Sequence, residues 1–201
     1  MVAADGLYIQ QADTYFGSIL PQFTGGFLNT FMYKNFTANI NIDFSKGGKY
    51  FSLSDHWGSF SGLLERTAGL NDKGVPVREP VADGGGVRVD GVTVDGKSLT
   101  TYVDAQTYYH QFRGSRIAEE HVYDLDFIKL RELSIGYNLP VGKLGIGKYV
   151  QAINVSLIGR NPLLIYAKNR DFDPSEISGI FGENSQFPGT RSFGFNVKVV
   201  F

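Results

Sequence analysis

The feature that most constrains this chain is a regular alternation of apolar and polar residues, which recurs in five separate segments. Successive side chains of a β-strand point to opposite faces, so a period of two predicts strands with one apolar and one polar face. The segment that ends the sequence shows the pattern most clearly, and its apolar face consists of Phe193, Phe195, Val197, Val199 and Phe201. We predict this strand at 191–201, and the others at 23–33, 36–45, 126–138 and 152–162.

Two local signals refine these strands. Lys34 and Asn35 separate the first two strands, and Asn tolerates the left-handed conformation that a two-residue hairpin turn needs. Within 126–138 the alternation changes phase by one residue near Arg131 and Glu132, which predicts a β-bulge.

The connections between the strands alternate in length. Residues 34–35 and 139–151 are short connections, whereas 47–122 and 167–190 are long. Outer-membrane β-barrels have short periplasmic turns and long extracellular loops. If Phe201 lies at the periplasmic end, every long connection falls outside the cell, so we predict that both long connections are extracellular loops.

The two faces of the predicted sheet differ in chemistry. In water the apolar face would pack against a second sheet, whereas in a bilayer it would face lipid and the polar face would line the lumen. We favour the bilayer and predict a lumen lined by Asn39, Asn41, Asp43, Asn154, Arg160, Asn196 and Lys198. Tyr33, Tyr137 and Phe201 adjoin the predicted periplasmic side, where aromatic residues form an interfacial girdle.

Five strands are too few to close a barrel, whose lower limit is about eight. An open sheet in hydrocarbon would leave unpaired backbone groups along both edges, at a high free-energy cost. The predicted fold is therefore all-β, with antiparallel strands that form the C-terminal segment of a large transmembrane β-barrel and do not close on their own. Residues 1–5 do not begin a signal peptide, so we expect that one was removed or that Met1 is not the true start.

Composition excludes several other classes of protein. The chain has no Cys, which excludes a disulfide framework, cysteine-metal sites and thiol catalysis. Its formal net charge of −1 provides no electrostatic footprint for nucleic acid, so we expect no nucleic-acid partner.

Short motifs along the chain resemble those of one family, both in their residues and in their order. Residues 129–140, KLRELSIGYNLP, resemble a characteristic strand of SusC/RagA-type TonB-linked outer-membrane transporters. The remaining matches are 17–27 (GSILPQFTGGF), 33–36 (YKNF), 160–164 (RNPLL), 171–176 (DFDPSE) and 188–195 (PGTRSFGF). Each motif is weak alone, but together they are specific, and the long connection 47–122 carries none.

The resemblance implies a barrel of about 22 strands with a plug in its lumen. It implies import of oligosaccharides or peptides across the outer membrane, with a SusD-like surface lipoprotein as a lid. TonB would act on the plug, and we expect the plug and the TonB-contacting segment to lie outside these 201 residues. The remaining partners would be outer-membrane lipid and the other strands of the same transporter.

The last strand has a second predicted role. Outer-membrane proteins resembling this one end in an aromatic residue preceded by alternating apolar residues, and the insertion machinery reads that strand by edge pairing. We predict this role for the apolar face that ends at Phe201, rather than that of an ordinary core strand.

The long connections contain three further groups of candidate residues. One group consists of aromatic residues that could contact substrate or the lid, although we favour packing within the loop. These residues are Trp57, Phe60, Tyr102, Tyr108, Tyr109 and Phe112. Asp171 and Asp173 are oxygen donors of the type that calcium takes, but their spacing fits no EF-hand, so a turn role is favoured. His56, His110 and His121 show no metal spacing and are predicted to lie at the surface. We expect no other metal and no cofactor.

Two alternative functions remain open at this point. A soluble β-sandwich that binds carbohydrate at the cell surface would explain the alternation if a second sheet covered the apolar face. A barrel enzyme with its site in the long loop would need a catalytic constellation, and none is readable, so we expect no enzymatic activity.

Overall fold

The computed structural model describes residues 1–113, 117–177, 182–184 and 186–201. They form two compact units. The sheet unit comprises the described parts of 18–49, 123–180 and 186–201, and the loop unit those of 1–17, 50–122 and 181–185.

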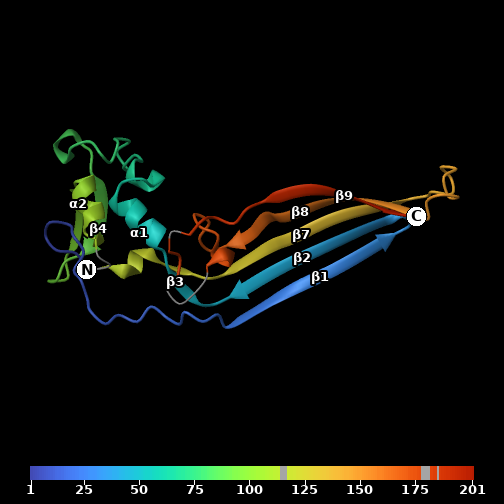
Figure 1. Cartoon of the computed structure of the whole chain (residues 1–201). Helices are drawn as coiled ribbons and strands as arrows, with labels where there is room; N and C mark the ends of the chain where they lie inside the picture. The colour runs from blue at the N-terminus through green and yellow to red at the C-terminus, as the bar shows by residue number, and fades with distance from the viewer. Residues whose placement is uncertain (114–116, 178–181, 185) are drawn as a thin grey trace. The chain divides into compact units, whose positions relative to one another are not determined.

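The sheet unit contains all five predicted strands, so the expectation of an antiparallel sheet is confirmed. Strands adjacent in sequence are neighbours in space, in the order β1-β2-β7-β8-β9. The strands are β1 (Phe23–Tyr33), β2 (Phe36–Lys46), β7 (Phe127–Leu139), β8 (Ala152–Ala167) and β9 (Ser192–Val200). In Figure 1 the β1–β2 turn, the β7–β8 connection and the C-terminus lie at the same end of the sheet. Among the described residues the sheet is open, with β1 and β9 as its edges.

The predicted bulge is confirmed at Arg131. Leu130 and Glu132 pair with neighbouring strands on both sides, and Arg131 is left out of both registers. On β8 the register also passes from Arg160 directly to Leu163. This irregularity absorbs Pro162, which has no N–H to donate, so β8 continues to Ala167 instead of ending at 162 as predicted.

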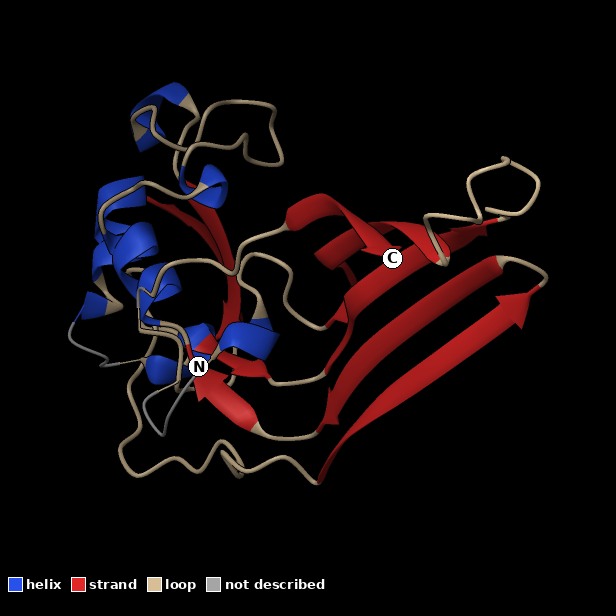
Figure 2. Ribbon diagram, turned by 45° about the vertical axis from the view of Figure 1, so that its right-hand side comes forward, coloured by secondary structure: helices blue, strands red, loops and turns tan. Residues whose placement is uncertain are grey.

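The loop unit has secondary structure of its own, so the chain as a whole is mostly β rather than all-β. Its main elements are α1 (Leu53–Phe60), β4 (Val87–Val92), β5 (Ser98–Val103) and α2 (Ala105–His110), and β4 pairs with β5 as a hairpin. Short 3-10 turns complete it, at Glu65–Thr67, Val81–Asp83 and Ala118–His121. Figure 2 distinguishes the helices from the long strands. Two short strands, β3 (Lys49–Phe51) and β6 (Val122–Asp124), pair separately.

A small apolar core holds the loop unit together. Val2, Val89 and Val103 are buried against one another, and Leu7 and Tyr8 pack beside them. A Cβ on Gly91 would lie 2.6 Å from Val2 Cγ2, so only glycine lets the N-terminal segment approach the hairpin this closely. Residues before β1 and residues after β2 therefore fold as one unit. Among the helices that the structure describes, none has the length and apolar character required to span a membrane.

Candidate functional site

The apolar face of the sheet is exposed over all five strands. One row across the sheet joins Ala38, Ile135, Leu157 and Phe195 through the strand register. Leu157 and Phe195 are 66% and 78% exposed, which is far more than a folded protein leaves on a contiguous apolar surface in water. This face must be covered by protein or lipid when the protein functions.

The polar face carries the residues predicted to line a lumen, and the register places them on one side. Asn41 pairs with Glu132, which pairs with Arg160, and Asn154 pairs with Lys198. Hydrogen bonds cross the strands on this face. Asn39 Nδ2 donates to Ser134 Oγ at 3.0 Å, and Asn154 Nδ2 donates to Asn138 Oδ1 at 2.8 Å. The polar face is thus an ordered hydrogen-bonded surface.

Five charged side chains form a cluster on the polar face, which we call the ionic cluster: Asp43, Lys129, Arg131, Asp173 and Glu176. The side chain of Lys129 is only 3% exposed, and its Nζ lies 2.7 Å from both Asp173 Oδ2 and Glu176 Oε1. Arg131 bridges Glu176, at 2.9 Å, and Asp43, at 2.7 Å. The cluster therefore joins β2 and β7 to the segment that follows β8.

The segment 173–176 is shaped to present its carboxylates to the sheet. Asp173 Oδ1 accepts from the backbone N–H of Ser175 at 3.0 Å and caps the 3-10 turn Pro174–Glu176, with Pro174 in its first turn. Burial alone would raise the pKa of Asp173, but hydrogen bonds from Lys129 and Ser175 outweigh it and hold the pKa below its ordinary value. The hydrogen bond from Lys129 likewise lowers the pKa of Glu176. Both carboxylates are therefore ionised near neutral pH.

These contacts leave the suggested calcium site at Asp171 and Asp173 without support. Asp173 is occupied as a cap and as the partner of Lys129. Within the described ranges, no three His, Asp or Glu side chains are grouped so that they could hold a metal.

The six loop aromatics are dispersed through the loop unit instead of forming one surface. Phe112 is buried, and Tyr108 lies edge-on to it. Phe60 stacks on His110, with 4.4 Å between ring centroids. The hydroxyls of Tyr102 and Tyr109 donate to Asp72 and to the Arg66 carbonyl. Trp57 is 48% exposed. Contact of these residues with substrate or lid stays a prediction.

The prediction of surface histidines is wrong for His56 and His121, which are 1% and 0% exposed. His121 Nδ1 lies 2.7 Å from Asp55 Oδ2, and Asp55 also accepts from Arg66 at 2.7 Å. The prediction was wrong because the connection 47–122 folds around a core of its own, which buries polar residues as well as apolar ones. Burial, and then the neighbouring His121, lowers the pKa of His56, although Asp55 opposes this. His110 is exposed, as predicted.

Comparisons with known proteins relate the chain to one family of receptors. No family model matches the chain. It is 27% identical over 201 aligned residues to TonB-dependent receptor P3 of Formosa agariphila, covering 90% of this chain and 17% of that protein. It is 25% identical to TonB-dependent receptor P26 of the same organism, covering 98% of this chain and 19% of that protein. The chain is a distant homologue of TonB-dependent receptors.

Solved structures support the same fold for this TonB-dependent receptor homologue. The RagAB peptide importer in its closed-closed state superposes with a TM-score of 0.60 at 17% identity, covering 99% of this chain and 20% of that one. Its open-open state gives a TM-score of 0.57 at 18% identity, covering 95% and 19%. The chain thus spans about a fifth of the length of the proteins it matches.

Proposed function

We propose that the sheet unit is the C-terminal part of the β-barrel of an outer-membrane TonB-dependent importer. One observation carries this proposal, namely that a five-stranded meander has exposed apolar side chains on every strand of one face, while its other face is polar, hydrogen-bonded and charged. Lipid is the environment that covers such an apolar face without a second sheet. The edges β1 and β9 would pair with the remaining strands of the same barrel.

The proposed topology places 47–122 and 167–190 outside the cell and the two short connections in the periplasm. The common position of the short connections and the C-terminus, at one end of the sheet, supports it. Tyr33, Phe36 and Tyr137 also lie at that end and fit an interfacial aromatic girdle. In this topology the apolar face of β9, together with Phe201 after it, is the insertion signal.

In this account the polar face lines the lumen through which an oligosaccharide or peptide is imported, and the protein is a transporter rather than an enzyme. The structural likeness to a peptide importer supports a role in import. A SusD-like lipoprotein would close the extracellular side, and TonB would act through a plug supplied by the rest of the protein.

A soluble β-sandwich is the alternative, and the structure does not favour it. A sandwich needs a second sheet large enough to cover five long strands. Apart from the five-stranded sheet, the described residues form only two-stranded sheets.

Single-cysteine labelling in whole cells tests the topology, because the chain has no cysteine of its own. Val94 and Phe187 are exposed in the long connections, and Lys34 and Leu144 lie in the short ones. A maleimide too large to pass porins is expected to label V94C and F187C in intact cells. It is expected to label K34C and L144C only after the outer membrane is permeabilised.

The converse pattern would overturn the proposed orientation. Equal labelling of all four variants in intact cells would contradict insertion in the outer membrane.

A further inference from the structure

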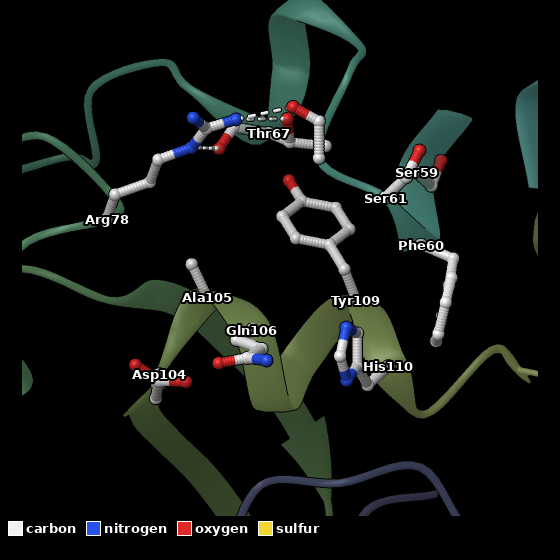
Figure 3. Close-up of a pocket in the computed structure, with 11 residues that line it drawn as sticks. Ser59, Phe60, Ser61, Thr67, Arg78, Asp104, Ala105, Gln106, Tyr109 and His110 are labelled. Carbon is white, nitrogen blue, oxygen red and sulfur yellow. Dashed lines mark hydrogen bonds between the residues drawn. The ribbon is translucent and has the colours of Figure 1, made fainter. Parts of the chain in front are cut away.

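The loop unit contains an open cavity of about 390 Å³ between α1, the segment 61–78 and α2. This volume lies within the range of small-ligand sites, roughly 300–1,000 Å³. Figure 3 shows the Tyr109 ring at the centre, with Arg78 and Thr67 above it and Asp104 and Gln106 below.

Two side chains that line the cavity are held in place by hydrogen bonds, one to other lining residues and one to a neighbouring residue. Arg78 donates three hydrogen bonds, to the carbonyls of Thr67 and Gly62 and to Thr67 Oγ1, at 2.8, 2.6 and 2.9 Å. Thr67 is itself buried. Tyr109 is fixed through its hydroxyl, which donates to the Arg66 carbonyl at 2.7 Å. A lining that is already ordered loses little entropy when it binds a ligand.

Arg78 and Asp104 each have part of their hydrogen-bonding capacity left. Arg78 retains Nη1, and within the described residues it forms no ion pair with a carboxylate. Asp104 caps α2 through Oδ1, which accepts from Thr107, so Oδ2 remains. Gln106 adds an amide with both a donor and an acceptor. The cavity therefore presents both donors and acceptors, with no net charge from the Arg78 and Asp104 pair.

This chemistry distinguishes between ligand classes. A carboxylate is bound most strongly by a bidentate guanidinium, and Arg78 has already committed Nε and Nη2. Asp104 would also repel a simple anion and Arg78 a simple cation, and a zwitterion would meet Arg78 through Nη1 alone, without the bidentate contact. A sugar hydroxyl both donates and accepts, so the hydroxyls of one or two sugar units match both Asp104 and Arg78, while the Tyr109 ring provides an apolar surface for the sugar face.

We propose that this cavity binds one or two sugar units of a neutral oligosaccharide. The proposal rests on the proposed function in one respect. If the chain is part of the importer, the cavity lies outside the cell, where it would contact the cargo of the transporter.

Saturation-transfer NMR on the whole detergent-solubilised protein tests the proposal, with cellobiose, maltose and mannobiose as neutral probes and Ala-Ala as a zwitterionic one. We expect at least one disaccharide to bind and the dipeptide not to bind. Gln106 is exposed, and its side chain has no hydrogen-bond partner among the described residues. Gln106→Ala is therefore expected to weaken sugar binding about 3- to 10-fold, the effect of losing one neutral hydrogen bond. Gln151→Ala, another exposed glutamine, is the matched control and should leave binding unchanged.

Asp104→Asn is a second variant that keeps a good helix cap. It should weaken sugar binding too, because an amide donates where the carboxylate only accepted. Sugar binding that neither variant changes, binding of none of the three sugars, or dipeptide binding sensitive to Gln106 would each overturn the proposal. The cysteine topology would be unaffected by any of these outcomes, so failure of the cavity proposal is distinguishable from failure of the proposed function.

Discussion

Leu157→Arg is expected to lower the free energy of unfolding of the lipid-embedded protein by about 2–4 kcal/mol, the cost of a basic residue at the bilayer midplane on a barrel's lipid face. Leu157 pairs with Phe195, near the middle of the nine-residue strand β9, so it would lie close to the midplane. Urea unfolding in lipid vesicles, followed by heat-modifiable gel mobility, measures the effect.

The adjacent residue provides the control. Ser156 lies on the polar face, where it pairs with Gly136 and Asn196. Ser156→Arg would point into a hydrated lumen and should change the free energy of unfolding by less than about 1 kcal/mol. If both arginines had the same small effect, the apolar face would be exposed to water and the barrel account would fail.

The second large effect is expected at the ionic cluster. Lys129→Met keeps most of the side-chain volume but removes the cation that both Asp173 and Glu176 contact. Breaking a buried ion pair costs roughly 3–5 kcal/mol, and partial exposure of both carboxylates reduces this to about 2–3 kcal/mol. The loss should be local, so hydrogen exchange and proteolysis within 168–177 are expected to accelerate while the strands stay protected.

Lys198→Met is the matched control for this experiment. Lys198 lies on the same face, is exposed and has no ion pair among the described residues. Its substitution should change stability by less than about 0.5 kcal/mol. Equal exchange rates in the two variants would show that the cluster does not hold the segment to the sheet.

The strands were predictable from sequence because alternation is a local signal. The predicted strand 23–33 matches β1 at both ends, and the phase change near Arg131 identified the bulge. The end of β8 was not predictable in the same way, because Pro162 stops an isolated strand but not one whose partner carries a bulge.

Contacts between residues that lie far apart in the sequence could not be predicted from it. Lys129 and Asp173 are 44 positions apart, and a lysine in an alternating strand gives no indication of its partner. The available signal was a polar residue between Ile128 and Leu130 together with the acidic segment 171–176, whose aspartates were interpreted only as turn residues or calcium ligands. His56 and His121 were misplaced for the same reason, since their burial depends on how the loop unit folds.

Spin-label accessibility along β9 tests the central claim most directly. Cysteines placed one at a time at 195, 196, 197 and 198, in protein reconstituted into lipid, sample both faces of one strand. The account predicts that labels at 195 and 197 collide with oxygen, which concentrates in the bilayer, and that labels at 196 and 198 collide with a water-soluble nickel complex. Access of the nickel complex to all four positions, or no alternation along the strand, would contradict a lipid-facing barrel wall.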